Sequence, residues 1–326
     1  MKKKWLFAAL MLLLLVLALS RFDGWNLLHS LKQIPLWSLA LLIGMQIVSQ
    51  LLVNLQWYKM AKFINLPVSF GDMFYINCQG AVIDSITPGV KFGGEVTRAV
   101  QISRKGNCPG ETAASVVAMQ KLFSLSAFFI INLFAAGFVI GKTSFLQAWY
   151  LHLTVYAVLI LFLLLFFAVF LMPHRMKIFF QTGKEPRFLW VSRIRNFFIT
   201  LLDHVISIRK NAGICVLLFL LSLLIWVVYP VKMYLLAVQI LPGVDIMYIA
   251  SVTFVSYMVA MLPVFPGGLG GFEGTMTGLL LTMGFIHSDA FVITVIFRFI
   301  TFWFVLLFSI VYAAVYKVGF MLKDSA

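Results

Sequence analysis

A glycine-rich stretch at residues 265–275 constrains the fold of this chain more than any other feature of its sequence. It places five glycines, Pro266 and the carboxylate of Glu273 between runs that are apolar enough for a membrane interior. Glycine weakens a helix, and each unpaired backbone group in hydrocarbon costs several kcal/mol. A stretch of this kind is tolerated at membrane depth only where protein covers it or where it lines a wet cavity. We therefore expect a covered turn here rather than a helix in contact with lipid.

The same pattern occurs 178 residues earlier, at residues 87–97. Superposing the two stretches aligns the pairs Pro88 and Pro266, Gly89 and Gly267, Gly93 and Gly271, Glu95 and Glu273, and Thr97 and Thr275. The chain has only four Glu residues, and two of them fall on this match, which makes coincidence a poor explanation. We interpret the chain as two copies of one ancestral half.

The composition is that of a membrane protein, with 62% hydrophobic and 11% charged residues. A soluble domain would be about 25% charged. Because about 20 apolar residues cross a bilayer, we expect an all-α polytopic membrane protein with about six full transmembrane helices plus two re-entrant helical hairpins in an inverted repeat. The full helices are expected at residues 5–19, 36–58, 112–140, 149–172, 212–240 and 290–318.

The chain is expected to form a single integral membrane domain over residues 1–326. The first repeat half is 36–140 with a hairpin at 72–105, and the second is 212–318 with a hairpin at 247–286. A basic cytoplasmic loop, 173–211, joins them, and its apolar residues recur at helical spacing. That spacing predicts an amphipathic helix with its apolar side in lipid; the alternative is a solvated connector. The apolar residues are Val191, Ile194, Phe198, Leu201, Val205 and Ile208.

The basic residues predict the topology. With the N-terminus in the cytoplasm, the loops on that side hold 19 of the 25 Lys and Arg residues, as the positive-inside rule requires. The first hairpin then enters from the cytoplasm and the second from outside, so the halves are inverted. Inverted repeats with broken helices are a recurrent construction in secondary transporters. The net charge of +14 is explained by these loops, and we expect no nucleic-acid partner.

Two cations lie inside predicted spans, Lys121 about 15 Å and Arg298 about 12 Å from opposite faces. Their contexts also match, at an offset of 177 residues. A charge at this depth costs about 2.5–3.5 kcal/mol or more unless it finds a partner or water. Glu95 and Glu273 are the natural partners. Backbone N–H groups at broken helix starts can in addition hold phosphate oxygens.

We therefore expect a polar midplane pocket for a lipid headgroup. Its residues are Asp84, Glu95, Arg98, Lys121, Glu273 and Arg298, and its turns are Pro88, Gly89, Gly93, Gly94, Pro266, Gly267, Gly268, Gly270 and Gly271. The alternative is that these charges form ion pairs that only hold the hairpins in place. For Asp84, polar lining and a helix cap near Pro88 are equally open. Lys232 is expected to snorkel outward rather than contact headgroups.

The chain resembles the multi-spanning region of bacterial lysylphosphatidylglycerol synthetases, the multiple peptide resistance factors, and their flippase-like stand-alone relatives. The likeness covers nearly the whole chain, and its motifs are Thr87-Pro88-Gly89, Gly93-Gly94-Glu95-Val96-x-Arg98, Pro266-Gly267-Gly268-Leu269-Gly270 with Glu273, and Arg298-Phe299. The family's synthetases carry a soluble C-terminal domain that transfers lysine from tRNA, whereas this chain stops at Ala326. The resemblance thus implies the lipid-translocating part rather than the aminoacyltransferase.

The function expected is a lipid flippase or scramblase in the cytoplasmic membrane of a bacterium or archaeon, with a membrane phospholipid as substrate. The sequence shows no metal-ligand spacing, no nucleotide motor and no nucleophile–His–acid pattern, so we expect no catalytic residue, metal or cofactor. Two alternatives remain open: a membrane subunit that presents lipid to a separate aminoacyl- or glycosyltransferase, and an intramembrane transferase with Glu95 or Glu273 as base. A lipid-modifying transferase as partner and a homodimer are also left open.

Overall fold

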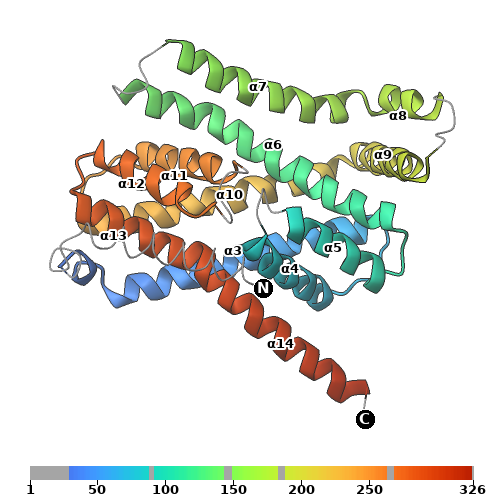
Figure 1. Ribbon diagram of the computed structural model, residues 1–326, viewed down its shortest axis with the longest axis horizontal. Coiled ribbons are helices and arrows are strands. Elements are labelled where there is room, and N and C mark those ends of the chain that lie inside the picture. Colours follow the sequence, from blue (N-terminus) through green and yellow to red (C-terminus); the bar gives the residue numbers. More distant parts are fainter. Residues whose placement is uncertain (1–28, 88–91, 143–148, 183–187, 263–267, 325–326) are drawn as a thin grey trace.

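The chain is an all-α polytopic membrane protein. The computed structural model describes residues 29–87, 92–142, 149–182, 188–262 and 268–324, and within these ranges every regular element is a helix (Figure 1). The predicted first span, 5–19, lies outside the described residues. So do four of the predicted turn residues, Pro88, Gly89, Pro266 and Gly267.

Four helices are long and apolar enough to cross a membrane: Leu36–Phe63, Gly110–Phe138, Ala212–Ile240 and His287–Gly319. A fifth span is present if the pair Tyr156–Leu171 and Pro173–Thr182, bent by 79°, counts as one. The bend falls at Met172, directly before Pro173, because a proline disfavours helical geometry in the residue that precedes it. Four or five of the about six predicted spans are thus found within the described residues.

The order of the helices repeats along the chain. The first half has α3 (Leu36–Phe63), α4 (Phe70–Ile86), α5 (Phe92–Lys105) and α6 (Gly110–Lys142). The second half has α10 (Ala212–Ile240), α11 (Ile246–Ala260), α12 (Gly271–Leu281) and α13 (His287–Arg298), which continues through a π-helix, η3 (Phe299–Trp303), into α14 (Phe304–Asp324). The connecting helices are α7 (Trp149–Leu171), α8 (Pro173–Thr182) and α9 (Leu189–Lys210).

The contacts between helices repeat in the same way. In the first half α4 packs against α5 as a short hairpin, and in the second half α11 packs against α12. Each hairpin also contacts the last helix of the other half, because α4 packs against α14 and α11 packs against α6. The two halves therefore exchange equivalent contacts, as two copies related by a local two-fold axis would.

Helices α3 and α10, which begin the two halves, run antiparallel (Figure 1). Near the end of α3, the Gln56 amide donates to the Leu218 carbonyl at 3.2 Å and to the Ser222 hydroxyl at 2.5 Å, near the start of α10. Earlier on α3, Gln46 and Ser49 accept from Lys232 of α10. Residue numbers rise on one helix as they fall on the other, so the halves begin in opposite directions. This geometry supports the inverted repeat.

Burial of Lys232 corrects one prediction. Its side chain is fully buried rather than snorkelling outward. The physical reason is local, because α3 presents polar side chains at the crossing with α10 and these satisfy the ammonium inside the protein. Hydropathy along one helix cannot show which polar groups a neighbouring helix will supply.

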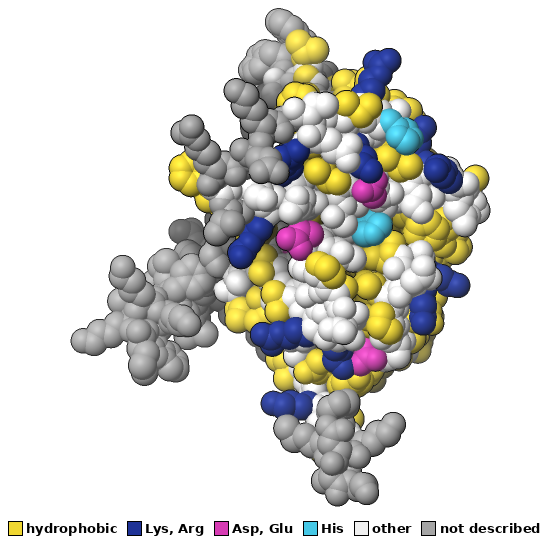
Figure 2. Space-filling view, turned by 90° about the vertical axis from the view of Figure 1, so that its right-hand side faces the viewer, with side chains coloured by type: hydrophobic (Ala, Val, Ile, Leu, Met, Phe, Trp, Pro, Cys, Tyr) yellow, Lys and Arg dark blue, Asp and Glu magenta, His cyan; other side chains and the backbone are white. Residues whose placement is uncertain are grey.

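One end of the helix stack gathers the basic residues. Hydrogen bonds of Ser115 to His204 and of Tyr316 to Asp72 bring the starts of α6 and α4 to the ends of α9 and α14. The end of α3 and the start of α10 meet at the same end. Figure 2 looks onto this end and shows Lys and Arg side chains spread over it, with a few Asp and Glu among them. This face agrees with the cytoplasmic side predicted from the basic loops.

Helix α9 is present in the predicted basic loop, but its apolar side packs differently from the prediction. Leu201, Leu202, Val205 and Ile208 are buried in an apolar cluster with residues of α3 and α6, not turned toward lipid. Only the first part of the helix exposes large apolar side chains, at Trp190 and Ile194. The neighbouring helices cover the apolar stripe because protein packing removes it from water as effectively as lipid does.

Candidate functional site

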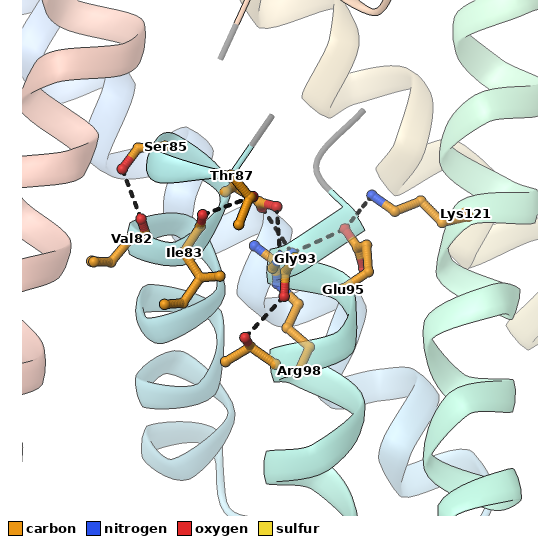
Figure 3. Close-up of polar contacts among 11 residues, drawn as sticks. Val82, Ile83, Ser85, Thr87, Gly93, Glu95, Arg98 and Lys121 are labelled. Atoms are coloured by element: carbon orange, nitrogen blue, oxygen red, sulfur yellow. Dashed lines mark hydrogen bonds and ion pairs between the residues drawn. The ribbon is translucent and has the colours of Figure 1, made fainter. Parts of the chain in front are cut away.

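The first hairpin carries a cluster of four charged side chains, here called the first cluster: Asp84, Glu95, Arg98 and Lys121. Arg98 Nη1 lies 3.1 Å from Asp84 Oδ2 and 2.9 Å from Glu95 Oε1, and Lys121 Nζ lies 2.6 Å from the same Glu95 oxygen. Glu95 therefore lies between the guanidinium of Arg98 on its own helix and the ammonium of Lys121 on α6 (Figure 3). Two carboxylates face two cations in this cluster.

Local structure explains why these four groups converge. Asp84 lies in the last turn of α4, whose end is marked by Thr87 as its C-cap. Glu95 is in the first turn of α5, where a carboxylate is favoured by the helix dipole. Arg98 follows one turn later on the same face of α5, and Lys121 reaches in from α6, which packs against α5.

Glycines make the close approach of the first cluster possible. The Gly94 N–H donates to Asp84 Oδ1 at 2.9 Å, and a Cβ at Gly94 would overlap that carboxylate. At Gly80 a Cβ would come within 2.6 Å of the Arg98 guanidinium carbon. Arg98 also lies over the ring of Trp57, with 5.7 Å from Cζ to the ring centroid. The backbone of the hairpin thus directly lines the charged groups.

The second hairpin carries a smaller cluster, here called the second cluster: Glu273 and Arg298. Glu273 Oε1 lies 3.0 Å from Arg298 Nε, and its other oxygen accepts from the Gly270 N–H at 2.6 Å. Gly270 has φ of +84° and precedes α12 directly, a conformation that favours glycine over other residues. One carboxylate thereby holds both the start of α12 and the cation of α13.

Aromatic rings enclose Arg298. Its guanidinium carbon lies 4.9 Å from the ring centroid of Phe272 and 4.4 Å from that of Phe302. Phe302 belongs to η3, the π-helix that begins one residue after Arg298. π-helical turns are rare and often occur at functional sites. The Arg298 side chain is only 7% exposed, and that of Glu273 is 21% exposed.

The two clusters correspond through the repeat. Lys121 and Glu95 of the first half match Arg298 and Glu273 of the second, and both pairs are at ion-pair distance. Arg98 and Asp84 have no charged counterpart, because the positions 178 residues later hold Met276 and Leu262. All six charged residues of the predicted pocket therefore lie in one of two ion-paired clusters. Whether a headgroup uses them is a separate question.

Several residues at these clusters were not predicted from sequence. Gly80, Trp57, Phe272 and Phe302 contact the cations directly. Only Phe302 carries a sequence signal, since it lies four residues after Arg298 on the same face of a helix. The other contacts depend on how separate helices cross.

A third polar contact links the first hairpin to the other half of the chain. Lys105 at the end of α5 pairs with Asp72 and donates to the Tyr316 hydroxyl of α14 at 3.1 Å. Burial alone would raise the pKa of Asp72, but hydrogen bonds from Lys105, Ser69 and Tyr316 hold it below its ordinary value. The Asp72 carboxylate therefore stays ionised and ties α4 to α14.

The largest cavity reported for the described residues lies elsewhere. It measures about 580 Å³ and is lined by residues 241–245 of the loop after α10 and by Tyr248, Thr282 and Met283. No charged residue of either cluster lines it. Both clusters therefore have their cations paired with carboxylates at close range in this conformation.

Comparison with known proteins places the chain among membrane proteins. The family model of the lysylphosphatidylglycerol synthase transmembrane region matches residues 5–309. A UPF0104 membrane protein of Methanothermobacter thermautotrophicus is 24% identical over 266 residues, 77% of each chain. A second, from Methanocaldococcus jannaschii, is 21% identical over 267 residues, 79% of this chain and 78% of its own. A third, from Pyrococcus horikoshii, is 23% identical over 283 residues, 81% of this chain and 82% of its own.

Proposed function

This chain belongs to the family of the lysylphosphatidylglycerol synthase transmembrane region, and from that premise we propose that it moves the polar headgroup of a membrane phospholipid across the bilayer, past its two charged clusters. The observation that carries this proposal is the matched pair of ion pairs, Lys121 with Glu95 and Arg298 with Glu273, at the turns of two hairpins from oppositely directed halves. Ionisable groups at membrane depth are costly and mark substrate paths more often than they serve as scaffolding.

The first cluster offers the easier approach for an anion. The Lys121 side chain is 34% exposed, whereas those of Arg98 and Asp84 are 11% and 10% exposed. A phosphate can therefore reach Lys121 before the cluster opens. It then competes with the carboxylate of Glu95 for Lys121 and Arg98, and the guanidinium can bind two phosphate oxygens at once.

The second cluster repeats this chemistry from the opposite side. Arg298 is enclosed by rings and more deeply buried, so a phosphate that displaces Glu273 meets a preformed, weakly hydrated guanidinium. The freed Glu95 or Glu273 can in turn contact a cationic group on the same headgroup. Passage from one cluster to the other moves the headgroup across the membrane while the lipid tails stay in hydrocarbon.

The energy source follows from the residues present. The described helices and the sequence carry no recognisable nucleotide-binding loop, so movement runs downhill or is driven by the membrane potential. The potential supplies about 2.3 kcal/mol per unit charge per 100 mV. An anionic headgroup is therefore driven toward the positive side.

The test is reconstitution of the full chain in vesicles with labelled lipids. The labels are phosphatidylglycerol, its lysyl ester, and a glycolipid without phosphate, and a membrane-impermeant reagent reports the leaflet of each. We expect at least one phosphate-bearing lipid to cross faster than in protein-free vesicles, and the phosphate-free lipid to show no acceleration. Equal acceleration of all three labels would contradict recognition of phosphate.

The same vesicles separate the alternatives. Mass spectrometry of the recovered lipid distinguishes a moved lipid from a modified one. A chemically changed lipid would identify a transferase. No movement and no change by the chain alone, with activity restored by a separate lipid-modifying enzyme, would identify a subunit that presents lipid.

A further inference from the structure

Lys232 is the most deeply buried charged residue among those the structure describes. It lies on α10, eight residues before the helix ends at Ile240, which is about 12 Å along the axis. Its exposure is 0%, compared with 6% for Arg298 and 9% for Arg98 and Asp84. Neither of the two charged clusters contains it.

The partners of Lys232 are all neutral. Its ammonium donates to the Gln46 amide oxygen and to the Ser49 hydroxyl, at 3.3 Å for Ser49, and it lies 4.3 Å above the ring centroid of Tyr229. The Ser49 hydroxyl donates its own hydrogen to the Met45 carbonyl at 2.9 Å, so its lone pair faces Lys232. Over the described part of the chain, no carboxylate lies within ion-pair distance of this ammonium, whereas Lys121, Arg98 and Arg298 each have one.

This environment can hold Lys232 with or without its proton. The ammonium has three N–H donors, and the site supplies two oxygen acceptors and one ring face. The neutral amine keeps two N–H donors for Gln46 and Ser49. It also removes an uncompensated charge from a low-dielectric interior, where such a charge is costly. Deprotonation therefore breaks no hydrogen bond to an oxygen.

A short chain of rings joins Lys232 to the second cluster. The Tyr229 ring lies 5.1 Å from that of Tyr257 on α11, and Tyr257 lies 5.0 Å from Phe272, whose face is covered by Arg298. The titratable or charged groups that face this region are Tyr229 on α10 itself, Tyr257 on α11 and Arg298 on α13. On α3 the side chains that contact Lys232 are Gln46 and Ser49, which do not titrate.

We propose that Lys232 is a proton-binding site and that its protonation is coupled to headgroup binding at the second cluster, which makes the chain a proton-linked lipid transporter. This inference rests on the proposed function. The amine lone pair accepts a proton from water when the helices open, and the ammonium later returns it to water. No other bond forms or breaks.

The coupling follows from electrostatics. The ammonium of Lys232 and the guanidinium of Arg298 are like charges in one weakly screened region, so each disfavours the other. An anionic phosphate bound at Arg298 offsets this repulsion and so favours proton uptake at Lys232. By linkage, proton uptake favours phosphate binding to the same extent. Proton and anionic headgroup therefore travel together.

The first arm of the test uses the reconstituted full chain with the membrane potential clamped to zero. A pH difference of one unit is imposed across vesicles that contain the wild type, Lys232→Met or Lys59→Met, an exposed lysine on α3 that serves as the matched control. With one proton per lipid, the steady-state ratio of labelled lipid between leaflets should shift up to about tenfold per pH unit in the wild type and in Lys59→Met. It should not respond in Lys232→Met.

The second arm needs no transport. Short-chain phosphatidylglycerol is added to the protein in detergent in a weakly buffered solution, and the pH is followed. The wild type should take up protons, at most one per chain at saturation, and Lys232→Met should take up none. Gln46→Leu/Lys232→Met replaces the polar contact by an apolar one and gives a folded comparison if Lys232→Met alone is unstable.

Each outcome decides the proposal. A lipid ratio in Lys232→Met, or in the apolar double variant, that follows the pH difference as in the wild type overturns it. Lipid movement by the wild type without any response to pH also overturns it, while the proposed function stands. If the wild type moves no lipid, the proposed function fails, and an absence of proton uptake in detergent separately rules out the proton site.

Discussion

The two hairpins carry the same pattern of glycines and glutamate but enclose their charges in different ways. In the first hairpin, backbone at Gly80 and Gly94 lies directly against Arg98 and Asp84, and two carboxylates face two cations. In the second, phenylalanine rings flank Arg298 and one carboxylate faces it. The duplicated sequence thus produced one site lined by backbone and one lined by rings.

This difference predicts how each site responds to change. Arg98 of the first cluster keeps Asp84 if Glu95 is lost, because both carboxylates contact the same Nη1. The second cluster loses its central ion pair if either Glu273 or Arg298 is replaced. The first cluster should therefore tolerate loss of a charge but not added volume, and the second should do the reverse.

Glu273→Gln should have the largest effect. It leaves the buried Arg298 without its ion pair, a loss of about 3–5 kcal/mol for a fully buried pair, and we expect the lower end because Glu273 is 21% exposed. Lipid movement should be lost, and the unfolding temperature in detergent should fall. Glu95→Gln should lower that temperature less, because Asp84 still faces Arg98.

The double variant Glu273→Gln/Arg298→Met separates recognition from scaffolding. It removes both charges, so thermal stability should recover toward that of the wild type. Lipid movement should stay absent, because the phosphate has lost its cation. Movement at the wild-type rate by a well-folded double variant would show that these charges only hold the hairpin in place.

Gly94→Ala should have the next largest effect, matched by Gly274→Ala in the second hairpin. A methyl group at Gly94 overlaps the Asp84 carboxylate, whereas one at Gly274 meets nothing within 4 Å. Overpacking costs about 1–3 kcal/mol, while Ala gains up to about 1 kcal/mol over Gly in an open helical position. Thermal unfolding should thus shift down for Gly94→Ala and slightly up for Gly274→Ala. Equal shifts would remove the proposed difference between backbone-lined and ring-lined sites.

Sequence alone predicted the repeat and its ion pairs because both are recorded as a fixed offset. The match of Glu95 with Glu273 and of Lys121 with Arg298 requires only that two copies fold alike. The ring contacts of Trp57 and Phe272 were not predicted, since they depend on how helices distant in sequence cross. Lys232 was misplaced for the same reason, because its partners Gln46 and Ser49 lie more than 180 residues away.

Helix α9 shows a second limit of sequence patterns. Its periodicity correctly indicated a helix, but an apolar stripe looks the same whether lipid or protein covers it. The buried contacts of Leu201 and Val205 with the first half decide between the two, and they are properties of the assembled fold.

Arg298→Lys should have a moderate effect at the ring-lined site. Lysine keeps the charge but loses the planar face that lies 4.9 Å and 4.4 Å from two ring centroids. Cation–π contacts of this kind contribute about 0.5–2 kcal/mol depending on desolvation. We expect a modest fall in unfolding temperature and slower lipid movement, measured in the same vesicles. Behaviour identical to the wild type would show that the rings contribute packing alone.

Lys121→Arg, the corresponding exchange in the first half, should have the smallest effect. Lys121 acts as a point charge on Glu95 at 2.6 Å, its side chain is 34% exposed, and its ammonium has no cation–π contact among the described residues. An arginine can keep the ion pair while its longer side chain extends toward the exposed side, so unfolding should change by less than about 0.5 kcal/mol, as at ordinary surface positions. Lipid movement should continue, because a guanidinium binds phosphate at least as well as an ammonium. Lys121→Met provides the contrast, since it removes the charge and should slow movement while stability changes little. If Lys121→Arg instead impaired folding as strongly as Arg298→Lys, the two halves would impose the same geometric demand on their cations. The contrast between a site that requires arginine and one that accepts either cation would then be lost.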